Sequence, residues 1–312
     1  MAKRTFPGNM FPLWTVIVAV VVSASISGRF AEYRRAFHVT VAGSGRPVLL
    51  VPGLATTGEV WDPTVARLQD RYELHVLTLA GFGGPDALGE PFLPRVASAI
   101  VEYVDERRLE RPVLVGHSLG GFLAFLAASE APGAFGGVVA VDGVPFLPAL
   151  ANPAATPGSQ TERADAMKRL YDSMTPEQFL IQTRVALSSM ITDPADVERA
   201  GKWAARADRG AVGTAIAEMM TTDLRKRSGR INAPVLLIGA LGASPAPMKG
   251  SFRDAYRAQV AAVPNVSVVF AERAKHFVML DDPAFFFPLL ESFLLRVSTA
   301  GSTPADSEGG YR

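Results

Sequence analysis

The stretch that decides the fold is residues 112–128, PVLVGHSLGGFLAFLAA. It opens with an apolar run at 113–115, which is typical of a strand buried on both faces of a sheet. The pentapeptide GHSLG follows at 116–120, and an apolar helical pattern comes directly after it. Its glycines allow a sharp turn from strand to helix without a Cβ clash. The pattern therefore predicts that the Ser118 hydroxyl projects at the edge of the sheet, beside the free N–H groups of a new helix.

Composition narrows the class of protein further. The 312 residues are 48% hydrophobic, enough for a large core built as one domain with an insertion. The formal net charge is +1 and no basic run is long, which argues against binding to nucleic acid. The absence of cysteine excludes disulfides and thiol catalysis. None of the four histidines pairs with another at metal-ligand spacing, so we expect neither a metal nor a cofactor.

The first 27 residues are typical of a targeting segment. Lys3 and Arg4 precede an apolar run at 11–22, and small residues follow it, with residues 22–24 as one candidate cleavage site. The run is shorter than the roughly 20 residues of a spanning helix. Residues 1–27 therefore predict a signal peptide and export to the periplasm or the medium. The alternative is an uncleaved anchor, the only case in which we expect a membrane contact.

Strand and helix patterns alternate along most of the remaining chain, which predicts an α/β fold with a mostly parallel, doubly wound sheet. No strand-like run occurs between Phe146 and Arg230, where the pattern is helical. We therefore expect a core of residues 28–145 and 231–297, a helical cap inserted at 146–230, and a flexible tail at 298–312. Strands are expected at 37–41, 47–51, 73–79, 113–115, 136–141, 234–239 and 266–270, and helices at 59–69, 92–108, 165–174, 176–190, 194–207, 210–224, 251–263 and 283–297.

Residues 37–297 resemble the α/β-hydrolase superfamily, in its cap-bearing serine esterase and lipase-like branch. The resemblance rests on VPGL at 51–54, GHSLGG at 116–121 and KHFVMLDDP at 275–283. It implies the α/β-hydrolase fold and a hydrolytic activity. Dehalogenases and epoxide hydrolases of this branch carry an aspartate at the elbow. Ser118 in that place favours acyl transfer.

Ser118 needs a neighbouring base to become nucleophilic. His276 follows the last predicted strand, and the resemblance assigns it that role. In most family members an acid follows the strand after the cap, but residues 239–245, GALGASP, contain no carboxylate. Asp142 ends the strand expected beside the elbow strand, where some relatives place their acid. Neighbouring strands lie about 4.8 Å apart, so Asp142 stays within reach of the histidine ring and is our candidate acid.

Other acidic residues are weaker candidates for this acid. Asp254 lies too far along, inside a predicted helix, while Asp281 and Asp282 follow His276 too closely and are expected to start the last helix. The main-chain N–H groups of Leu54 and Leu119 are the expected donors of an oxyanion hole.

The three other histidines have no expected part in the chemistry. We expect His117, beside Ser118, to be structural and His75 to lie in the core. His38 carries no signal.

Candidate residues for an apolar substrate pocket lie near the strand ends and in the cap. The first group is Trp61, Phe82, Phe146 and Leu147; cap candidates are Met167, Met174, Phe179, Met190, Trp203, Met219 and Met220. These predict a hydrolase for carboxylic esters of apolar, modest-sized substrates, working through an acyl-serine intermediate. Lactone, amide or carbon–carbon bond hydrolysis by the same residues remains an alternative. So does a non-catalytic ligand-binding protein, and, less favoured, a membrane-tethered scaffold.

Overall fold

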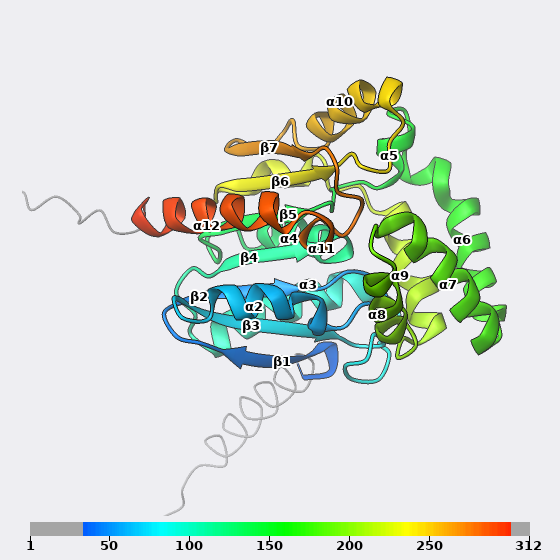
Figure 1. Ribbon diagram of the computed structural model, residues 1–312, viewed down its shortest axis with the longest axis horizontal. Coiled ribbons are helices and arrows are strands. Elements are labelled where there is room, and N and C mark those ends of the chain that lie inside the picture. The colour runs from blue at the N-terminus through cyan, green and yellow to red at the C-terminus, as the bar shows by residue number, and fades with distance from the viewer. Residues whose placement is uncertain (1–33, 301–312) are drawn as a thin grey trace, which may run out of the picture.

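The computed structural model describes residues 34–300, and its centre is a seven-stranded sheet of order β1-β3-β2-β4-β5-β6-β7 (Figure 1). Strand β1 runs antiparallel to β3, and the other neighbours are parallel. The predicted mostly parallel sheet is therefore confirmed. The predicted signal peptide lies outside the described residues. The strands are β1 (Phe37–Ala42), β2 (Arg46–Val51), β3 (Tyr72–Leu79), β4 (Val113–His117), β5 (Gly137–Val141), β6 (Val235–Ala240) and β7 (Val266–Ala271).

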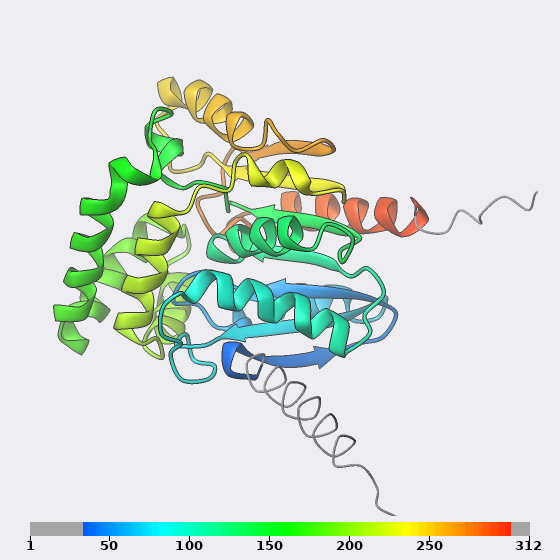
Figure 2. The same ribbon diagram turned by 180° about the vertical axis from the view of Figure 1, so that it is seen from behind.

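Helices cover both faces of the sheet, as Figures 1 and 2 show from opposite sides. One face carries η1 (Gly58–Trp61), α2 (Asp62–Leu68) and α12 (Pro283–Ala300), and the other carries α3 (Phe92–Glu106), α4 (Leu119–Glu130) and α10 (Lys249–Gln259).

Alternation along the strands produces these two layers. In β4, Leu114 packs into the layer of α3 and α4, while its neighbours Val113 and Val115 pack into the layer of α12. Each central strand is thus apolar on both sides, as its continuous hydrophobic run predicts.

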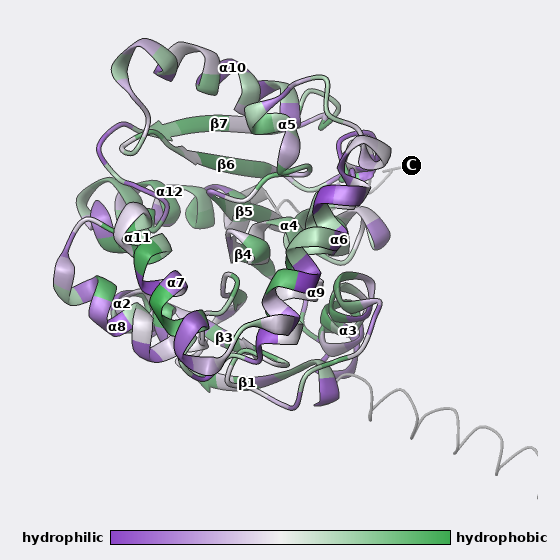
Figure 3. Ribbon diagram, turned by 90° about the vertical axis from the view of Figure 1, so that its right-hand side faces the viewer, coloured by the Kyte–Doolittle hydropathy of each residue, from purple (hydrophilic) through white to green (hydrophobic). Residues whose placement is uncertain are grey.

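A block of helices separates β5 from β6. It comprises α5 (Pro148–Ala151), α6 (Pro157–Ser173), α7 (Pro176–Met190), α8 (Pro194–Ala204), α9 (Arg209–Thr221) and η2 (Arg227–Arg230). We call residues 148–230 the helical insertion. Helices α6–α9 lie at the end of the sheet where the parallel strands finish (Figures 1 and 3). Figure 3, viewed from that end, shows hydrophobic strands behind helices of mixed character.

The starts of the insertion helices follow from their capping residues. The side chains of Thr156 and Thr175 accept hydrogen bonds from the N–H groups three residues on, in capping boxes, and proline occupies the next position in both helices. Asp193 and Asp208 cap α8 and α9 without a capping box: their side chains accept from the N–H groups of Ala195 and Ala211. Each helix therefore begins where a side-chain acceptor replaces the missing main-chain partner.

Two polar contacts tie the insertion to the core. The Glu218 carboxylate on α9 accepts hydrogen bonds from the N–H groups of Phe92 and Leu93, both at 2.7 Å, at the start of α3. On η1, the Glu59 carboxylate accepts from Trp203 Nε1 at 3.0 Å and from Arg206 at 2.6 Å. A carboxylate at a helix N-terminus accepts from the free N–H groups there and interacts favourably with the positive end of the helix dipole.

The structure corrects several expected boundaries. Helix α6 begins at Pro157 rather than at 165, because its first turns are polar and the capping box, not an apolar stripe, starts it. Helix α12 continues to Ala300, and Ser298 donates to the Leu294 carbonyl at 2.7 Å, so the tail expected from 298 is placed too early. Residues 301–312 lie outside the described part. Across residues 34–300, the helices lack the combination of length and apolarity that a membrane span requires.

Candidate active site

Ser118 occupies a strained corner between β4 and α4. Its φ of 53° and ψ of −116° lie in a region that residues other than glycine rarely adopt. Two main-chain hydrogen bonds hold it there: Ser118 N–H donates to the Val141 carbonyl at 2.9 Å, and Phe122 N–H donates to the Ser118 carbonyl at 3.0 Å. The neighbouring strand and the new helix together impose the sharp turn expected from the motif.

The glycines around Ser118 are explained by close approach of the backbone. A Cβ on Gly116 would lie 2.1 Å from the carbonyl oxygen of Gly120, and one on Gly120 would lie 2.2 Å from that of Val51. A Cβ on Gly143 would lie 2.4 Å from the Ser118 carbonyl oxygen. Such separations are far inside van der Waals contact. The elbow can pack this tightly only because these positions lack side chains.

The structure brings Asp142 and His276 into direct contact. Asp142 follows β5, and its Oδ2 lies 2.6 Å from His276 Nδ1. An ionised carboxylate only accepts hydrogen bonds, so Nδ1 carries the proton in this pair and the neutral ring keeps Nε2 as its acceptor. His276 lines a cavity that Ser118 also lines. The three residues selected from sequence are therefore brought together at the carboxyl ends of β4, β5 and the segment after β7.

Two further donors hold Asp142, and sequence analysis identified neither. The Tyr256 hydroxyl on α10 donates to Asp142 Oδ1, and the Ala240 N–H at the end of β6 donates to the same oxygen at 2.8 Å. Burial, and then the negative charge of Asp142, raise the pKa of Tyr256 well above its usual value. Tyr256 therefore stays protonated and acts as a donor. Ala240 lies in the segment 239–245 that lacks a carboxylate, and it contributes its main-chain N–H instead.

His117 fixes the backbone of the loop that carries His276. The ring is buried, and its Nε2–H donates to the His276 carbonyl at 3.1 Å. Burial, followed by the proximity of His276, lowers the pKa of His117 well below its usual value, so the ring stays neutral. The rings of His117 and His276 lie with their centroids 4.7 Å apart. His117 thus has a structural role, as expected: its hydrogen bond joins the elbow to the backbone of His276.

The same loop is also tied to the helical insertion. Asp281 accepts hydrogen bonds from the Lys275 N–H at 2.8 Å and from the N–H and hydroxyl of Thr192 at 2.9 and 2.8 Å. Asp281 ends α11 (Val278–Asp281), so the expectation that it starts the last helix is wrong. For Asp282 that expectation is right, because its carboxylate accepts from the Phe285 N–H at the start of α12.

The cavity beside Ser118 has a volume of about 330 Å³ and a mostly apolar lining. Leu54 lines it, and Leu119 is the first residue of α4, so the Leu119 N–H has no acceptor within the helix. The elbow, the Leu54 loop, the insertion and the His276 loop all contribute to the wall of the cavity. The residues that line the cavity are Leu54, Ala55, Thr56, His117, Ser118, Leu147, Tyr171, Phe179, Gln182, Thr183, Ala186, Leu187, Met190, Val212, Ile216, Met219, His276 and Phe277.

Three of the four aromatic or apolar pocket candidates from the core are corrected, since only Leu147 lines this cavity. Trp61 is fully buried and packs near Phe286, and Phe82 is fully buried beside Phe92. Phe146 is also fully buried, with the Arg225 guanidinium 4.9 Å from its ring centre. Large aromatic side chains near strand ends are drawn into the core because burial of their area is favourable.

The candidates from the insertion divide in the same way. Phe179, Met190 and Met219 line the cavity, and Met220 lines a neighbouring pocket. The rest, Met167, Met174 and Trp203, are outside both linings. Within residues 34–300, no group of three or more histidine or acidic side chains is arranged to hold a metal ion.

Comparison with known proteins identifies the class. Residues 48–289 match the model of the alpha/beta hydrolase family, and the chain belongs to this family. Among curated proteins, it is 23% identical over 259 residues to the pimeloyl-[acyl-carrier protein] methyl ester esterase of Aliivibrio salmonicida, covering 81% of this chain and 93% of that protein.

Solved structures share the fold. A thermophilic esterase from Thermogutta terrifontis matches with a TM-score of 0.67 and 20% identity, covering 84% of this chain and 93% of that one. The enol-lactonase from Burkholderia xenovorans matches with a TM-score of 0.66 and 16% identity, covering 83% and 96% of the two chains. The protein is thus a hydrolase-family member with the expected architecture.

Proposed function

We propose that the protein is a serine hydrolase that cleaves carboxylic esters of apolar, modest-sized substrates. The observation that carries the proposal is the contact between Asp142 Oδ2 and His276 Nδ1, at 2.6 Å, in a histidine that shares a cavity with the strained Ser118. A carboxylate that orients an imidazole beside a serine at a strand–helix turn is the arrangement needed to activate that serine.

The reaction begins with attack of Ser118 Oγ on the ester carbonyl carbon. His276 Nε2 takes the hydroxyl proton as the new bond forms, and Asp142 stabilises the resulting imidazolium without taking the proton itself. Collapse of the tetrahedral intermediate breaks the bond to the alcohol oxygen, which leaves with the proton from His276. Water then attacks the acyl-serine with the same proton transfers, releasing the acid and restoring Ser118.

The negative oxygen of each tetrahedral intermediate requires preformed donors. We assign this task to the main-chain N–H groups of Leu119 and Leu54, because Leu119 opens α4 and Leu54 lines the cavity. The N-terminal end of α4 adds a favourable dipole. Loss of one such donor typically costs about 3–4 kcal/mol of transition-state stabilisation.

The cavity supports the expected substrate class. Its volume of about 330 Å³ lies at the lower end of the usual range of roughly 300–1,000 Å³ for small-molecule sites. Apart from Ser118 and His276, the polar side chains that line it are those of Thr56, His117, Tyr171, Gln182 and Thr183. Thr56 already donates its hydroxyl proton to the Leu54 carbonyl at 2.9 Å. The walls therefore suit an acyl or alcohol group of modest size.

The test combines covalent labelling with turnover. A fluorophosphonate probe should label Ser118 in the full-length protein, and digestion should place the label on that residue. With p-nitrophenyl butyrate, Ser118→Ala and His276→Ala should each lose about 10³-fold or more of kcat, and Asp142→Asn a comparable factor because it leaves the ring in the wrong tautomer. A panel of lactones and amides distinguishes the alternative bond types.

Two results would contradict the proposal. Absence of label at Ser118 in folded protein would remove the activated serine and favour a ligand-binding protein. Near wild-type activity of Asp142→Asn would instead remove only the assignment of the acid.

A further inference from the structure

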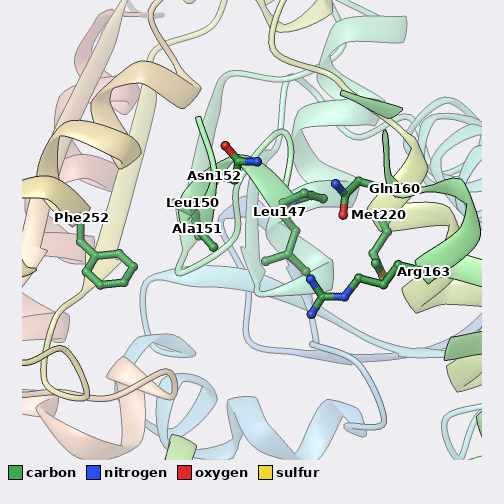
Figure 4. Close-up of a pocket in the computed structure, with 9 residues that line it drawn as sticks. Leu147, Leu150, Ala151, Asn152, Gln160, Arg163, Met220 and Phe252 are labelled. Carbon is green, nitrogen blue, oxygen red and sulfur yellow. The ribbon is translucent and has the colours of Figure 1, made fainter. Parts of the chain in front are cut away.

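A second pocket adjoins the cavity at Ser118. Its volume is about 350 Å³, and Leu147 lines both spaces. Residues of α5, α6, α9 and α10 surround it (Figure 4). The lining consists of Leu147, Pro148, Leu150, Ala151, Asn152, Gln160, Arg163, Met220 and Phe252.

The polar groups of this pocket favour a negatively charged ligand. No acidic residue is among those that line it, and Arg163 is its one charged residue. In Figure 4 the Arg163 side chain extends from α6 toward Leu147. Other arginines on the described surface form ion pairs, as Arg206 does with Glu59. Within residues 34–300, Arg163 has no carboxylate partner.

The amide side chains add donors. The Asn152 oxygen already accepts a hydrogen bond from the Ala154 N–H at 3.1 Å, so the amide NH₂ is the part of Asn152 left to donate. One guanidinium compensates one negative charge, and its planar donors match a carboxylate in particular. The chemistry of the pocket is therefore that of a receptor for a monoanionic end group.

The remaining lining is apolar and suits a methylene chain. Leu147, Leu150, Met220 and Phe252 supply most of the wall, and burial of each CH₂ group is favourable by about 0.8 kcal/mol. A chain that starts at an ester bound to Ser118 and passes Leu147 meets both this apolar wall and Arg163. The two pockets together thus offer a reactive end at Ser118 and a charged end at Arg163.

We propose that the second pocket is a subsite for the terminal carboxylate of the substrate. The preferred substrates are then monoesters of aliphatic dicarboxylic acids, with the ester at Ser118 and the free carboxylate at Arg163. This inference rests on the proposed esterase function for its turnover assay, and it extends that function by naming a charged end group on an otherwise apolar substrate.

The first test measures selectivity by the full-length enzyme. Monomethyl esters of dicarboxylic acids of increasing length are compared with methyl alkanoates of equal length. Above a threshold length, the ratio of kcat/KM for charged over neutral ester should exceed one, and Arg163→Gln should lower this ratio about fivefold, chiefly through KM. Arg163→Lys should retain part of it. Because the guanidinium is exposed, 0.5 M NaCl should also reduce the ratio.

A matched control lies on the same helix. Arg169 is exposed on α6 and does not line the pocket, so Arg169→Gln removes an equal charge without touching the subsite. Its selectivity ratio should equal that of the wild type. Equal ratios in wild type and Arg163→Gln at every chain length would overturn the proposal, as would an equal loss in Arg169→Gln.

A second test needs no turnover. Calorimetry with adipate monomethyl ester and its longer homologues should show weaker binding, by about fivefold, to Ser118→Ala/Arg163→Gln than to Ser118→Ala. Equal binding overturns the subsite even if the enzyme proves to be an esterase. Weaker binding with no ester hydrolysis and no Ser118 labelling by wild type would instead overturn the catalytic proposal and leave the subsite standing.

Discussion

Tyr256→Phe removes one oxygen atom from the network that holds the proposed catalytic acid. In the wild type, the Tyr256 hydroxyl and the Ala240 N–H both donate to Asp142 Oδ1, while Oδ2 faces His276 Nδ1 at 2.6 Å. After the substitution, Oδ1 keeps the Ala240 N–H at 2.8 Å. The ring can still pack edge-on against Phe270, since that contact does not involve the hydroxyl. The change is thus confined to the hydrogen bond.

The expected cost follows from the charge of the acceptor. A hydrogen bond to a charged group contributes about 1.5–3 kcal/mol, and the lower figure applies because a second donor remains. A loss of about 1.5 kcal/mol should lower Tm by about 2–3 °C in a chain of this size. We expect kcat to fall about tenfold, since orientation of Asp142 matters most when His276 carries positive charge in the transition state. Tyr256 does not line the cavity, so KM should change little.

The assay is steady-state hydrolysis of p-nitrophenyl butyrate together with thermal unfolding. Tyr103→Phe is the matched control, because it also deletes a buried phenol oxygen, one that lies 2.6 Å from His75 Nδ1 and away from the cavity. It should lower Tm with kcat unchanged within twofold. A Tyr256→Phe enzyme with normal kcat and lowered Tm would refute the positioning argument and leave Tyr256 only a part of the core.

Two other predictions concern stability. The pKa of His117 is lowered from 6.5 in the folded protein, so the unfolded chain binds the proton more readily, and the stability that neutral His117 contributes is complete above pH 6.5 and is lost as the pH falls below it. His117→Phe should therefore flatten the dependence of the unfolding free energy on pH below 6.5 by up to about 1.4 kcal/mol per pH unit. An unchanged slope would contradict burial of the ring as the cause. The added Cβ of Gly201→Ala on α8 meets open space, so this variant should stabilise the protein against urea unfolding by about 0.5–1 kcal/mol. Gly213→Ala on α9 places a Cβ 2.9 Å from Tyr171 Cβ and should destabilise the protein by about 1–3 kcal/mol. Equal effects of the two variants would contradict the packing of α6 on α9.

The fold was accessible from sequence because the core strands are short continuous apolar runs. The run at 113–115 and the glycines after it predicted the elbow, and the steric crowding at Gly116 and Gly120 shows why no other residue serves there. The contact of Asp142 with His276 was also within reach, since both follow strands that end at the same edge of one parallel sheet, with only β6 between β5 and β7. Their catalytic part stays a prediction.

The parts that sequence analysis missed depend on side-chain direction. Tyr256 lies on the buried face of α10, as the helical pattern predicts for an apolar residue. Nothing in the neighbouring sequence distinguishes a phenol that donates to Asp142 from one that only packs in the core. Trp61 and Phe82 failed as pocket residues for the converse reason: both follow strand ends, but their rings turn inward to gain burial. Likewise, Asp281 gives no local sign that it joins the His276 loop to Thr192.

In the proposed mechanism, an acid placed after β5 leaves the end of β6 without any side-chain role in catalysis. Ala240 contributes an amide N–H, which every amino acid except proline can offer, so the chemistry constrains the backbone there but not the residue type. Natural variation or directed libraries can therefore change residues 243–245 with the proton-transfer groups untouched, whereas Leu241 is buried and a Cβ on Gly242 would lie 2.2 Å from the Arg273 carbonyl oxygen. A proline at 240 is the one change that this scheme forbids.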